Sequence, residues 1–155
     1  MNVFLEKFVN SVFEKSGKVL DLGAGDFSDV NGFKNKGWEA EGVDIKTGID
    51  LEKPYLSKSA PFDLVFSNYV LQFIKNKTQF IKTACDNLKT SGWLFIHAFD
   101  KSDKNSSSDI TQESLKEMLS KQGFKNISIQ LFDYFDKDPG HNHWHKVLEA
   151  TAQKS

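Results

Sequence analysis

Two glycines flanked by carboxylates make residues 19–26 the part of the chain best suited to hold a ligand. Gly23 and Gly25 follow an apolar strand pattern, with Asp21 just before them and Asp26 just after. Glycine adopts positive φ angles and has no Cβ to keep a ligand from the backbone, so we expect a cofactor to rest on this loop. The two carboxylates would repel a pyrophosphate and attract a cation. The loop therefore predicts a cofactor that carries positive charge.

Polar residues also end two further strand patterns, at the edge where open α/β sheets bind ligands. Asp44 ends the second pattern, about twenty residues beyond the glycine loop, which is the spacing of an acid that hydrogen-bonds ribose hydroxyls. Ser67 and Asn68 follow the apolar run over residues 62–66. Ser28 stands where a dinucleotide fingerprint has its third glycine, so a nicotinamide-dependent oxidoreductase is the weaker alternative.

Three of the four histidines, His141, His143 and His145, alternate along an extended segment near the C-terminus. Alternate residues of a strand share one face, so these imidazoles can converge on one ligand. If the last strand is antiparallel to its neighbours, they border the cofactor edge. We expect His141 or His143 to line the substrate site or accept a proton; a metal site and solvated histidines are the alternatives. We assign no metal, and we expect His97 to be a core residue.

The composition indicates one soluble domain with a small partner. The chain has 155 residues, about the length of a single domain, and 20 Lys and Arg against 21 Asp and Glu give a net charge of −1. No basic field attracts nucleic acid or an anionic membrane, and no apolar run approaches the roughly 18 residues of a membrane span. We expect a cytoplasmic monomer or weak homodimer. The single cysteine, Cys85, is expected to be a small buried hydrophobe.

Strand and helix patterns alternate along the chain. Helical spacing predicts helices over residues 4–15, 26–36, 73–88 and 111–122, and apolar runs predict strands over 18–22, 38–45, 62–66, 93–99, 124–135 and 144–152. The turn between the last two strands is too short for a crossover helix, so they form an antiparallel hairpin. Residues 46–61 leave room for a few extended residues around Asp50 and one helical turn, whereas residues 101–108 predict a solvated, mobile loop. The alternation predicts an α/β fold with a Rossmann-like, doubly wound, mainly parallel sheet.

The combination of these motifs resembles the class I S-adenosylmethionine-dependent methyltransferases. The similarity covers nearly the whole chain and lies in five segments, residues 19–25, 42–45, 50–51, 62–74 and 87–94. The histidine-rich ending, followed by a strand, resembles the small members often labelled tellurite-resistance-like. The resemblance implies strand order 3-2-1-4-5-7-6 with the last strand antiparallel. It also implies one methyltransferase domain over residues 1–155. The helix over residues 1–15 and the polar loop over residues 101–108 are candidate covers of the cofactor cleft.

The same resemblance assigns cofactor roles to named residues. Asp21 would face the methionine amino group, Asp44 the ribose hydroxyls and Asp50 the adenine amino group. Ser67 would present its backbone near the sulfonium. The remaining cofactor-binding residues would be those beneath the methionyl and ribose parts and the two that sandwich the adenine: Gly23, Ala24, Gly25, Ile45 and Leu51.

The resemblance implies transfer of a methyl group to a small-molecule acceptor, with neither nucleic acid nor membrane as partner. Methyltransferases that act on the amines of bases typically carry an Asn/Asp-Pro-Pro-aromatic motif after the fourth strand. This chain has Ser67, Asn68, Tyr69 and Val70 there, so a nucleic-acid base is disfavoured. A protein-directed methyltransferase and a catalytically silent S-adenosylmethionine-binding module are the alternatives.

Overall fold

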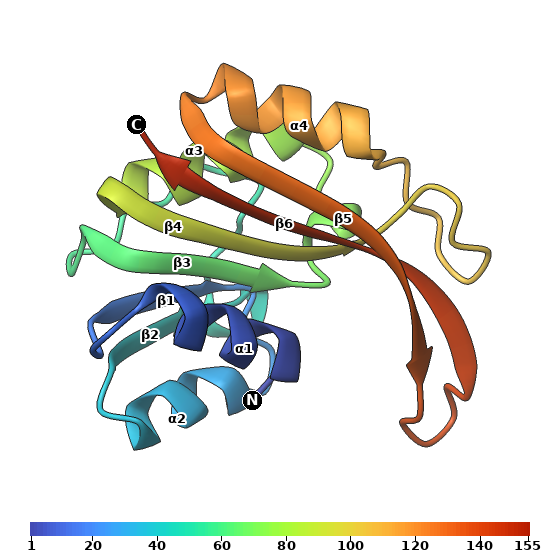
Figure 1. Ribbon diagram of the computed structural model, residues 1–155, viewed down its shortest axis with the longest axis horizontal. Coiled ribbons are helices and arrows are strands. Elements are labelled where there is room, and N and C mark those ends of the chain that lie inside the picture. Colours follow the sequence, from blue (N-terminus) through green and yellow to red (C-terminus); the bar gives the residue numbers. More distant parts are fainter.

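One six-stranded sheet lies between two layers of helices in the computed structural model of the chain, which describes all residues, Met1–Ser155 (Figure 1). The helices are α1 (Val3–Val12), α2 (Ser28–Asn35), α3 (Lys77–Asn87) and α4 (Gln112–Lys121), with two 3-10 turns, η1 (Ile45–Thr47) and η2 (Leu71–Phe73). The strands are β1 (Lys18–Leu22), β2 (Glu39–Val43), β3 (Phe62–Asn68), β4 (Leu88–Phe99), β5 (Phe124–Asp136) and β6 (His143–Lys154). They are ordered β2-β1-β3-β4-β6-β5 across the sheet.

The sheet is parallel except for its last strand. β2, β1, β3 and β4 pair in parallel, whereas β6 runs antiparallel to both β4 and β5. The Rossmann-like fold, the closing hairpin and the reversed last strand are therefore confirmed. The loops after β1, β2 and β3 lie at one edge of this sheet, and β6 begins at the same edge, since parallel strands end together.

One strand of the expected order 3-2-1-4-5-7-6 is absent, so the sheet ends at β2. The extended residues predicted around Asp50 form turns instead. The Asp50 carboxylate accepts the Glu52 N–H at 3.0 Å, and the Asp50 carbonyl accepts the Lys53 N–H at 3.1 Å. Leu51 is buried in the core, so this segment packs inward and does not pair with β2. The single helical turn predicted in this region forms as η1.

Helices α1 and α2 cover one face of the sheet. Leu5 and Val9 of α1 and Phe33 of α2 form a buried cluster with sheet residues that include Phe66 and Phe95. Leu5 and Val9 are four residues apart, so they lie on the same side of the helix. The N-terminal helix is therefore an integral part of the core on this face.

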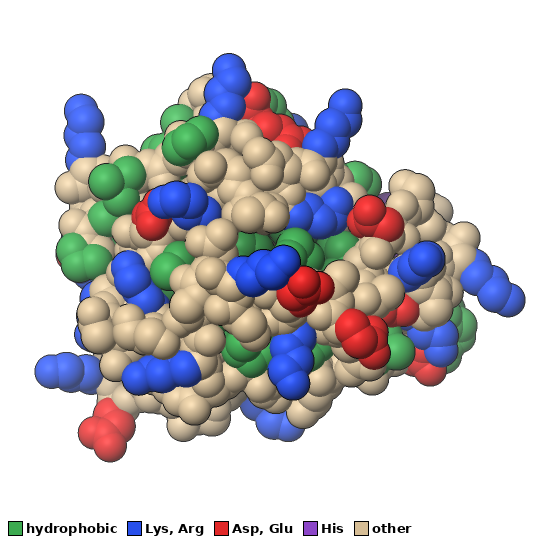
Figure 2. Space-filling view, turned by 90° about the horizontal axis from the view of Figure 1, so that it is seen from above, with side chains coloured by type: hydrophobic (Ala, Val, Ile, Leu, Met, Phe, Trp, Pro, Cys, Tyr) green, Lys and Arg blue, Asp and Glu red, His purple; other side chains and the backbone are tan.

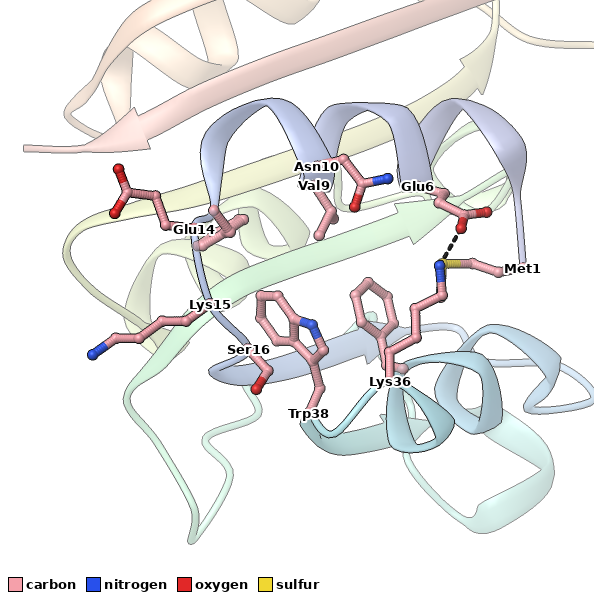
Figure 3. A pocket seen from close by; sticks show the side chains of 11 residues that line it. Met1, Glu6, Val9, Asn10, Glu14, Lys15, Ser16, Lys36 and Trp38 are labelled. Atoms are coloured by element: carbon pink, nitrogen blue, oxygen red, sulfur yellow. Dashed lines mark hydrogen bonds and ion pairs between the residues drawn. The ribbon is translucent and has the colours of Figure 1, made fainter.

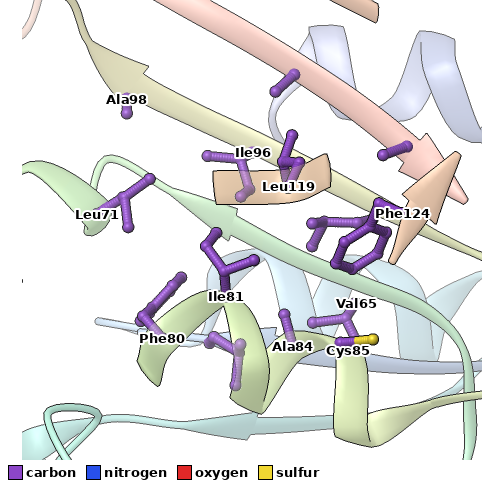
Figure 4. Packing of buried hydrophobic residues seen from close by; sticks show 14 of the residues in the cluster. Val65, Leu71, Phe80, Ile81, Ala84, Cys85, Ile96, Ala98, Leu119 and Phe124 are labelled. Carbon is purple, nitrogen blue, oxygen red and sulfur yellow. The ribbon is translucent and has the colours of Figure 1, made fainter. Parts of the chain in front are cut away.

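Helices α3 and α4 cover the opposite face, where the larger apolar cluster lies (Figure 4). Phe80, Ile81 and Ala84 of α3 and Leu119 of α4 are fully buried there against side chains of β3 and β4. Cys85 packs in the same cluster, as expected, and burial raises the pKa of its thiol. The two layers of helices cover both faces of the sheet, which leaves its carboxyl edge and the hairpin as the places for a ligand.

The loop over residues 101–108 is solvated only in part. Five of its residues are exposed, as the composition predicts: Lys101, Ser102, Lys104, Asn105 and Ser107. Asp103 and Ser108 are buried, with relative exposures of 3 % and 8 %. The Ser108 hydroxyl donates to the Phe99 carbonyl at 2.6 Å, and the Asp103 carboxylate contacts His145. Polar side chains therefore tie this loop to β4 and β6 and supply the contacts that apolar residues supply elsewhere.

The surface that carries α4 has charges of both signs. Lysine and acidic side chains are interspersed there, and the face shows no continuous basic stripe (Figure 2). None of the helices combines the length and the apolar character needed to cross a membrane.

Candidate functional site

The loop after β1 is held in place by the neighbouring strand. The backbone N–H groups of Gly23 and Ala24 both donate to the Val43 carbonyl, at 2.8 and 2.9 Å. Gly23 and Gly25 have φ angles of 90° and 57°, in the region that favours glycine. A Cβ on Gly23 would collide with the Val70 Cγ2, so the close approach of these two loops also requires a glycine.

Asp44 links the end of β2 to this loop. One carboxylate oxygen accepts the Gly25 N–H and the other accepts the Lys46 N–H, both at 3.0 Å. These backbone donors, with the Lys46 N–H first, hold the pKa of Asp44 below its usual range. An ionised carboxylate is thus fixed beside the glycine loop, at the end of the second strand, where the sequence predicts a residue that hydrogen-bonds ribose hydroxyls.

Asp21 is the most perturbed acid of this edge. It is 3 % exposed, and burial, followed by repulsion from Asp29, Asp44 and Asp26, raises its pKa to about 8. Asp29 is bound by the Asn2 N–H at 2.8 Å and by the Asn68 side-chain amide at 3.1 Å.

None of these four acids forms an ion pair with a lysine or histidine. We call the glycine loop and its acids the acidic cradle: Asp21, Gly23, Ala24, Gly25, Asp26, Asp29 and Asp44. Acids this close together and without a cationic partner are suited to a ligand that brings its own positive charge.

The other predicted cofactor residues lie near the acidic cradle but differ in how much of their side chain is exposed to a ligand. Ser67 is buried at the end of β3, next to β1, and its hydroxyl donates to the Leu22 carbonyl at 2.8 Å. Ile45 follows Asp44 directly and is 68 % exposed. Asp50 lies in the turn after η1, and Leu51 offers little surface to a ligand because it is 6 % exposed.

A cavity lies between the loops after β3 and β4 and the end of the β5–β6 hairpin. It has a volume of about 580 Å³. We call it the hairpin pocket, and it is lined by aromatic, acidic and imidazole side chains and short loop residues: Tyr69, Phe99, Asn105, Tyr134, Asp136, Asp138, Gly140, His141, His143 and His145. Tyr69 follows Asn68 at the end of β3, so this pocket adjoins the strand ends that form the cradle. Burial raises the pKa of Tyr69, which keeps its phenol neutral.

The three histidines near the C-terminus gather at this pocket, as their alternation predicts. The Nε2 atoms of His143 and His145 are 3.0 Å apart, whereas the rings of His141 and His143 are 5.9 Å apart. His141 Nδ1 lies 3.3 Å from the Asp136 carboxylate. No group of three His, Cys, Asp or Glu side chains is arranged to hold a metal ion.

Asp103 is a site residue that the sequence did not indicate. Its Oδ2 lies 2.7 Å from His145 Nδ1, although 42 residues separate the two along the chain. Asp103 stands in a run of Lys, Ser, Asp and Asn, which predicts solvent exposure. Only the folded chain brings this carboxylate to the histidines.

His97 is a core residue, as expected, but only one of its two ring nitrogens has a hydrogen-bond partner. Its ring is fully buried, and its Nε2 lies 2.7 Å from a Glu149 carboxylate oxygen. Its Nδ1 has no hydrogen-bond partner. The ring packs among Phe4, Phe95 and Tyr69. Since Tyr69 lines the hairpin pocket, His97 lies directly behind a wall of that pocket.

A further cavity, of about 220 Å³, lies between α1 and the α2 side of the sheet (Figure 3). Its lining includes Val9, Trp38 and an ion pair between Glu6 and Lys36. It contains none of the predicted site residues, so we do not connect it with ligand binding.

Comparisons with known proteins agree with this geometry. A family model described as a methyltransferase domain matches residues 1–129. No curated protein matches the chain. The solved structures it resembles include a SAM-dependent methyltransferase from Archaeoglobus fulgidus, with 19 % identity, a TM-score of 0.74, and coverage of 98 % of this chain and 92 % of that one.

Two other similar structures were solved with ligands. One is the Burkholderia thailandensis 1,6-didemethyltoxoflavin-N1-methyltransferase with 1,6-didemethyltoxoflavin and S-adenosylhomocysteine (19 % identity, TM-score 0.72, 99 % of this chain and 81 % of that one). The other is a Haemonchus contortus phosphoethanolamine N-methyltransferase with phosphomonomethylethanolamine and S-adenosylhomocysteine (16 % identity, TM-score 0.77, 99 % of this chain). This chain spans 52 % of the length of that enzyme.

The TM-scores of these three structures establish a shared fold at identities below 20 %, and the family match extends over most of the chain. The chain therefore belongs to the methyltransferase-domain family, and its fold is that of the class I S-adenosylmethionine-dependent methyltransferases.

Proposed function

We propose that this chain transfers a methyl group from S-adenosylmethionine to a small molecule that binds in the hairpin pocket. The observation that carries the proposal is the adjacency of two unlike sites. One is a cradle of unpaired acids, and the other is a cavity of about 580 Å³, within the range of roughly 300–1,000 Å³ typical of small-molecule sites.

The residues of the acidic cradle fit the cofactor. When bound, S-adenosylmethionine supplies a methyl group on a positively charged sulfur, ready for in-line displacement. Asp21 would pair with its amino group, and that cation would return the raised pKa of Asp21 toward its ordinary range. Asp44, held ionised by two backbone donors, would accept hydrogen bonds from the ribose.

The remaining assignments follow the chain around the cradle. Gly23, Ala24 and Gly25 would lie beneath the methionyl and ribose parts, and Ser67 would offer its backbone near the sulfonium. Ile45, exposed beside Asp44, would cover one face of the adenine, and Asp50 would bond the adenine amino group. Leu51 would close the other face through the small part of its side chain that is exposed. In the hairpin pocket, His141 and His143 would line the acceptor site.

The N-terminal helix is the proposed cover of this edge. The Asn2 N–H donates to Asp29 at 2.8 Å, and Asn2 also caps α1 by accepting the Phe4 N–H at 2.9 Å. This contact joins the beginning of α1 to an acid of the cradle. A ligand in the cradle would therefore have α1 next to it.

Calorimetric titration of the full chain with S-adenosylmethionine, and separately with a nicotinamide dinucleotide, tests the cofactor assignment. We expect binding of the first at micromolar concentration and none of the second. Asp44→Ala should weaken binding about 10- to 100-fold, the loss typical of hydrogen bonds to a charged group. Asp109→Ala is the matched control, because that carboxylate is exposed and pairs with Lys77. Full affinity in Asp44→Ala would overturn the assignment.

A further inference from the structure

We propose that Asp103 and His145 hold His143 as the proton acceptor of the hairpin pocket, and that the methyl acceptor is a planar aromatic molecule, neutral or cationic, whose reacting atom carries a proton. This inference rests on the proposed function, because it assigns chemistry to the same pocket. Asp103 and His145 are positioning residues in this scheme, and His143 is the residue that touches the acceptor.

The three side chains form a continuous chain of polar contacts from the interior to the pocket. Asp103 Oδ2 lies 2.7 Å from His145 Nδ1, and His145 Nε2 lies 3.0 Å from His143 Nε2. The side chains of Asp103 and His145 are 1 % and 7 % exposed. Asp103 pairs with no lysine, so its charge acts on His145. Burial strengthens that interaction, because little water screens it.

The ring of His145 is fixed in orientation. It stacks on the Phe99 ring, with 4.2 Å between centroids and 15° between planes. The Asn105 N–H donates to the second Asp103 oxygen at 2.8 Å, and the Asn105 side-chain amide donates to the Trp144 carbonyl at 2.9 Å. Asn105 thus fastens the loop that carries Asp103 to the strand that carries His145.

The carboxylate sets the donor and acceptor roles along this chain. An ionised Asp103 only accepts hydrogen bonds, so the proton of neutral His145 resides at Nδ1 and its Nε2 is bare. The proton between the two Nε2 atoms then belongs to His143, whose Nδ1 is left bare. His143 Nδ1 makes no hydrogen bond within the protein, which leaves it available to a molecule in the pocket.

The proton released during methyl transfer can be taken up entirely by these residues. The reacting atom of the acceptor bonds to the methyl carbon, the carbon–sulfur bond breaks, and its electron pair stays on sulfur. Methylation gives the reacting atom of the acceptor a positive charge. That atom then loses its proton to His143 Nδ1 and becomes uncharged. His143 passes its Nε2 proton to His145, and the resulting imidazolium lies against the Asp103 carboxylate. For each methyl group transferred, the hydrogen-bonded residues His143 and His145 take up one proton, and no further reactant is needed.

The walls of the pocket indicate the class of acceptor. Tyr69, Phe99 and Tyr134 present aromatic rings, against which a planar molecule packs favourably. Asp136 and Asp138 place negative charge at the same pocket, which disfavours an anionic ligand. A neutral or cationic ring system with an N–H or hydroxyl group satisfies both features and supplies the proton that His143 takes.

Side-chain ¹⁵N NMR of the histidines in the full chain, saturated with S-adenosylhomocysteine, tests the proton arrangement. We expect the His145 proton at Nδ1 and the His143 proton at Nε2. Asp103→Asn should shift His145 away from the pure Nδ1–H form, because an amide can donate to Nδ1 as well as accept from it. A role of Asp103 in loop packing alone would not move these tautomers.

Asp138→Asn is the matched control, since it removes a carboxylate of the same pocket that does not bond His145. If Asp103→Asn does not fold, His143→Gln serves instead, and His145 must keep its proton at Nδ1 in that variant. The proposal is overturned if His145 carries its proton at Nε2 in the unaltered protein, or if Asp103→Asn and Asp138→Asn give the same tautomers as the unaltered chain.

Titration of the same labelled protein with benzimidazole and with benzoate tests the acceptor class. Both probes are planar, but benzimidazole is neutral or cationic with a ring N–H, and benzoate is an anion. We expect benzimidazole to shift the His143 signals and benzoate to leave them in place. An absent response to benzimidazole, or an equal response to benzoate, would contradict the inferred class. Failure of the proposed function is seen separately, as an absence of S-adenosylmethionine binding in calorimetry.

Discussion

Replacing Asp21 by Asn is expected to stabilise the ligand-free protein and at the same time to weaken cofactor binding. The pKa of Asp21 is raised from 3.8 to about 8, first by burial and then by three neighbouring acids. In the unfolded chain the carboxyl group ionises near its ordinary value. Between about pH 4 and pH 8 the native state therefore binds more protons than the unfolded state, and its stability falls as the pH rises.

The size of the effect follows from the same two values. At pH 7 the Asp21 carboxyl is ionised in the unfolded chain and mainly protonated in the native protein. The pH lies about three units above the ordinary pKa of 3.8, and each unit lowers the free energy of unfolding by about 1.4 kcal/mol, so the total loss of stability is about 4 kcal/mol. Asparagine does not ionise in the native or the unfolded state, so the variant does not lose this stability at neutral pH. The gain in stability should be small near pH 4, grow through neutral pH and level off above about pH 8.

Urea denaturation of both proteins at several pH values between 4 and 9 measures this difference. Asp26→Asn is the control in the same loop, because Asp26 is exposed and the Ser28 N–H lowers its pKa. We expect little change in that variant. A difference between Asp21→Asn and the unaltered protein that did not depend on pH would refute the reasoning.

Binding gives the second readout of the same substitution. At pH 7 the bound amino group should ionise Asp21, so cofactor binding releases up to about one proton. Calorimetry in buffers of different ionisation enthalpy counts that proton. Asp21→Asn should release none and bind at least about 10-fold more weakly.

Three other predictions follow from the fold. Gly23→Ala, at φ 90° and facing Val70, should lower the thermal unfolding temperature and abolish cofactor binding, since the left-handed region alone costs about 1–2 kcal/mol; an unchanged temperature would contradict the close approach. Phe80→Ala should cost about 3–5 kcal/mol in urea denaturation because Phe80 is fully buried, whereas Phe73→Ala, at a position 73 % exposed, should cost little. Asn2→Ala, which removes the side-chain cap of α1 and keeps the core residues of that helix, should weaken S-adenosylmethionine affinity in calorimetry; undiminished affinity would exclude a lid role for α1.

The parts of the fold that depend on neighbouring residues were predictable from the sequence. β1 has the expected bounds, because an apolar run ending at a glycine turn is a local signal. Thr111 caps α4, as predicted, and accepts the Ser114 N–H at 3.0 Å. In each case the residues that make the contact lie within one turn or one strand–helix unit.

The parts that depend on distant contacts were not predictable. Nothing local to residues 101–108 indicates that Asp103 is buried, since its partner His145 lies on the last strand. The absent strand near Asp50 has a related cause, because Leu51 packs into the core instead of alternating along a sheet edge. The alternation of the histidines indicated that they share a face, but only the folded hairpin shows that His143 and His145 contact each other.

The β5–β6 hairpin extends beyond the sheet that supports it. The pairing of β4 with β6 stops at Phe99 and Val147, whereas β5 and β6 continue to pair as far as Asp136 and His143 (Figure 1). The projecting part shares no ladder with the strands that carry the acidic cradle. If the hairpin pocket holds the methyl acceptor, as we propose, exchanging this projecting part for one of different length or chemistry would change which molecule is methylated and would leave the strands that carry the acidic cradle unaltered.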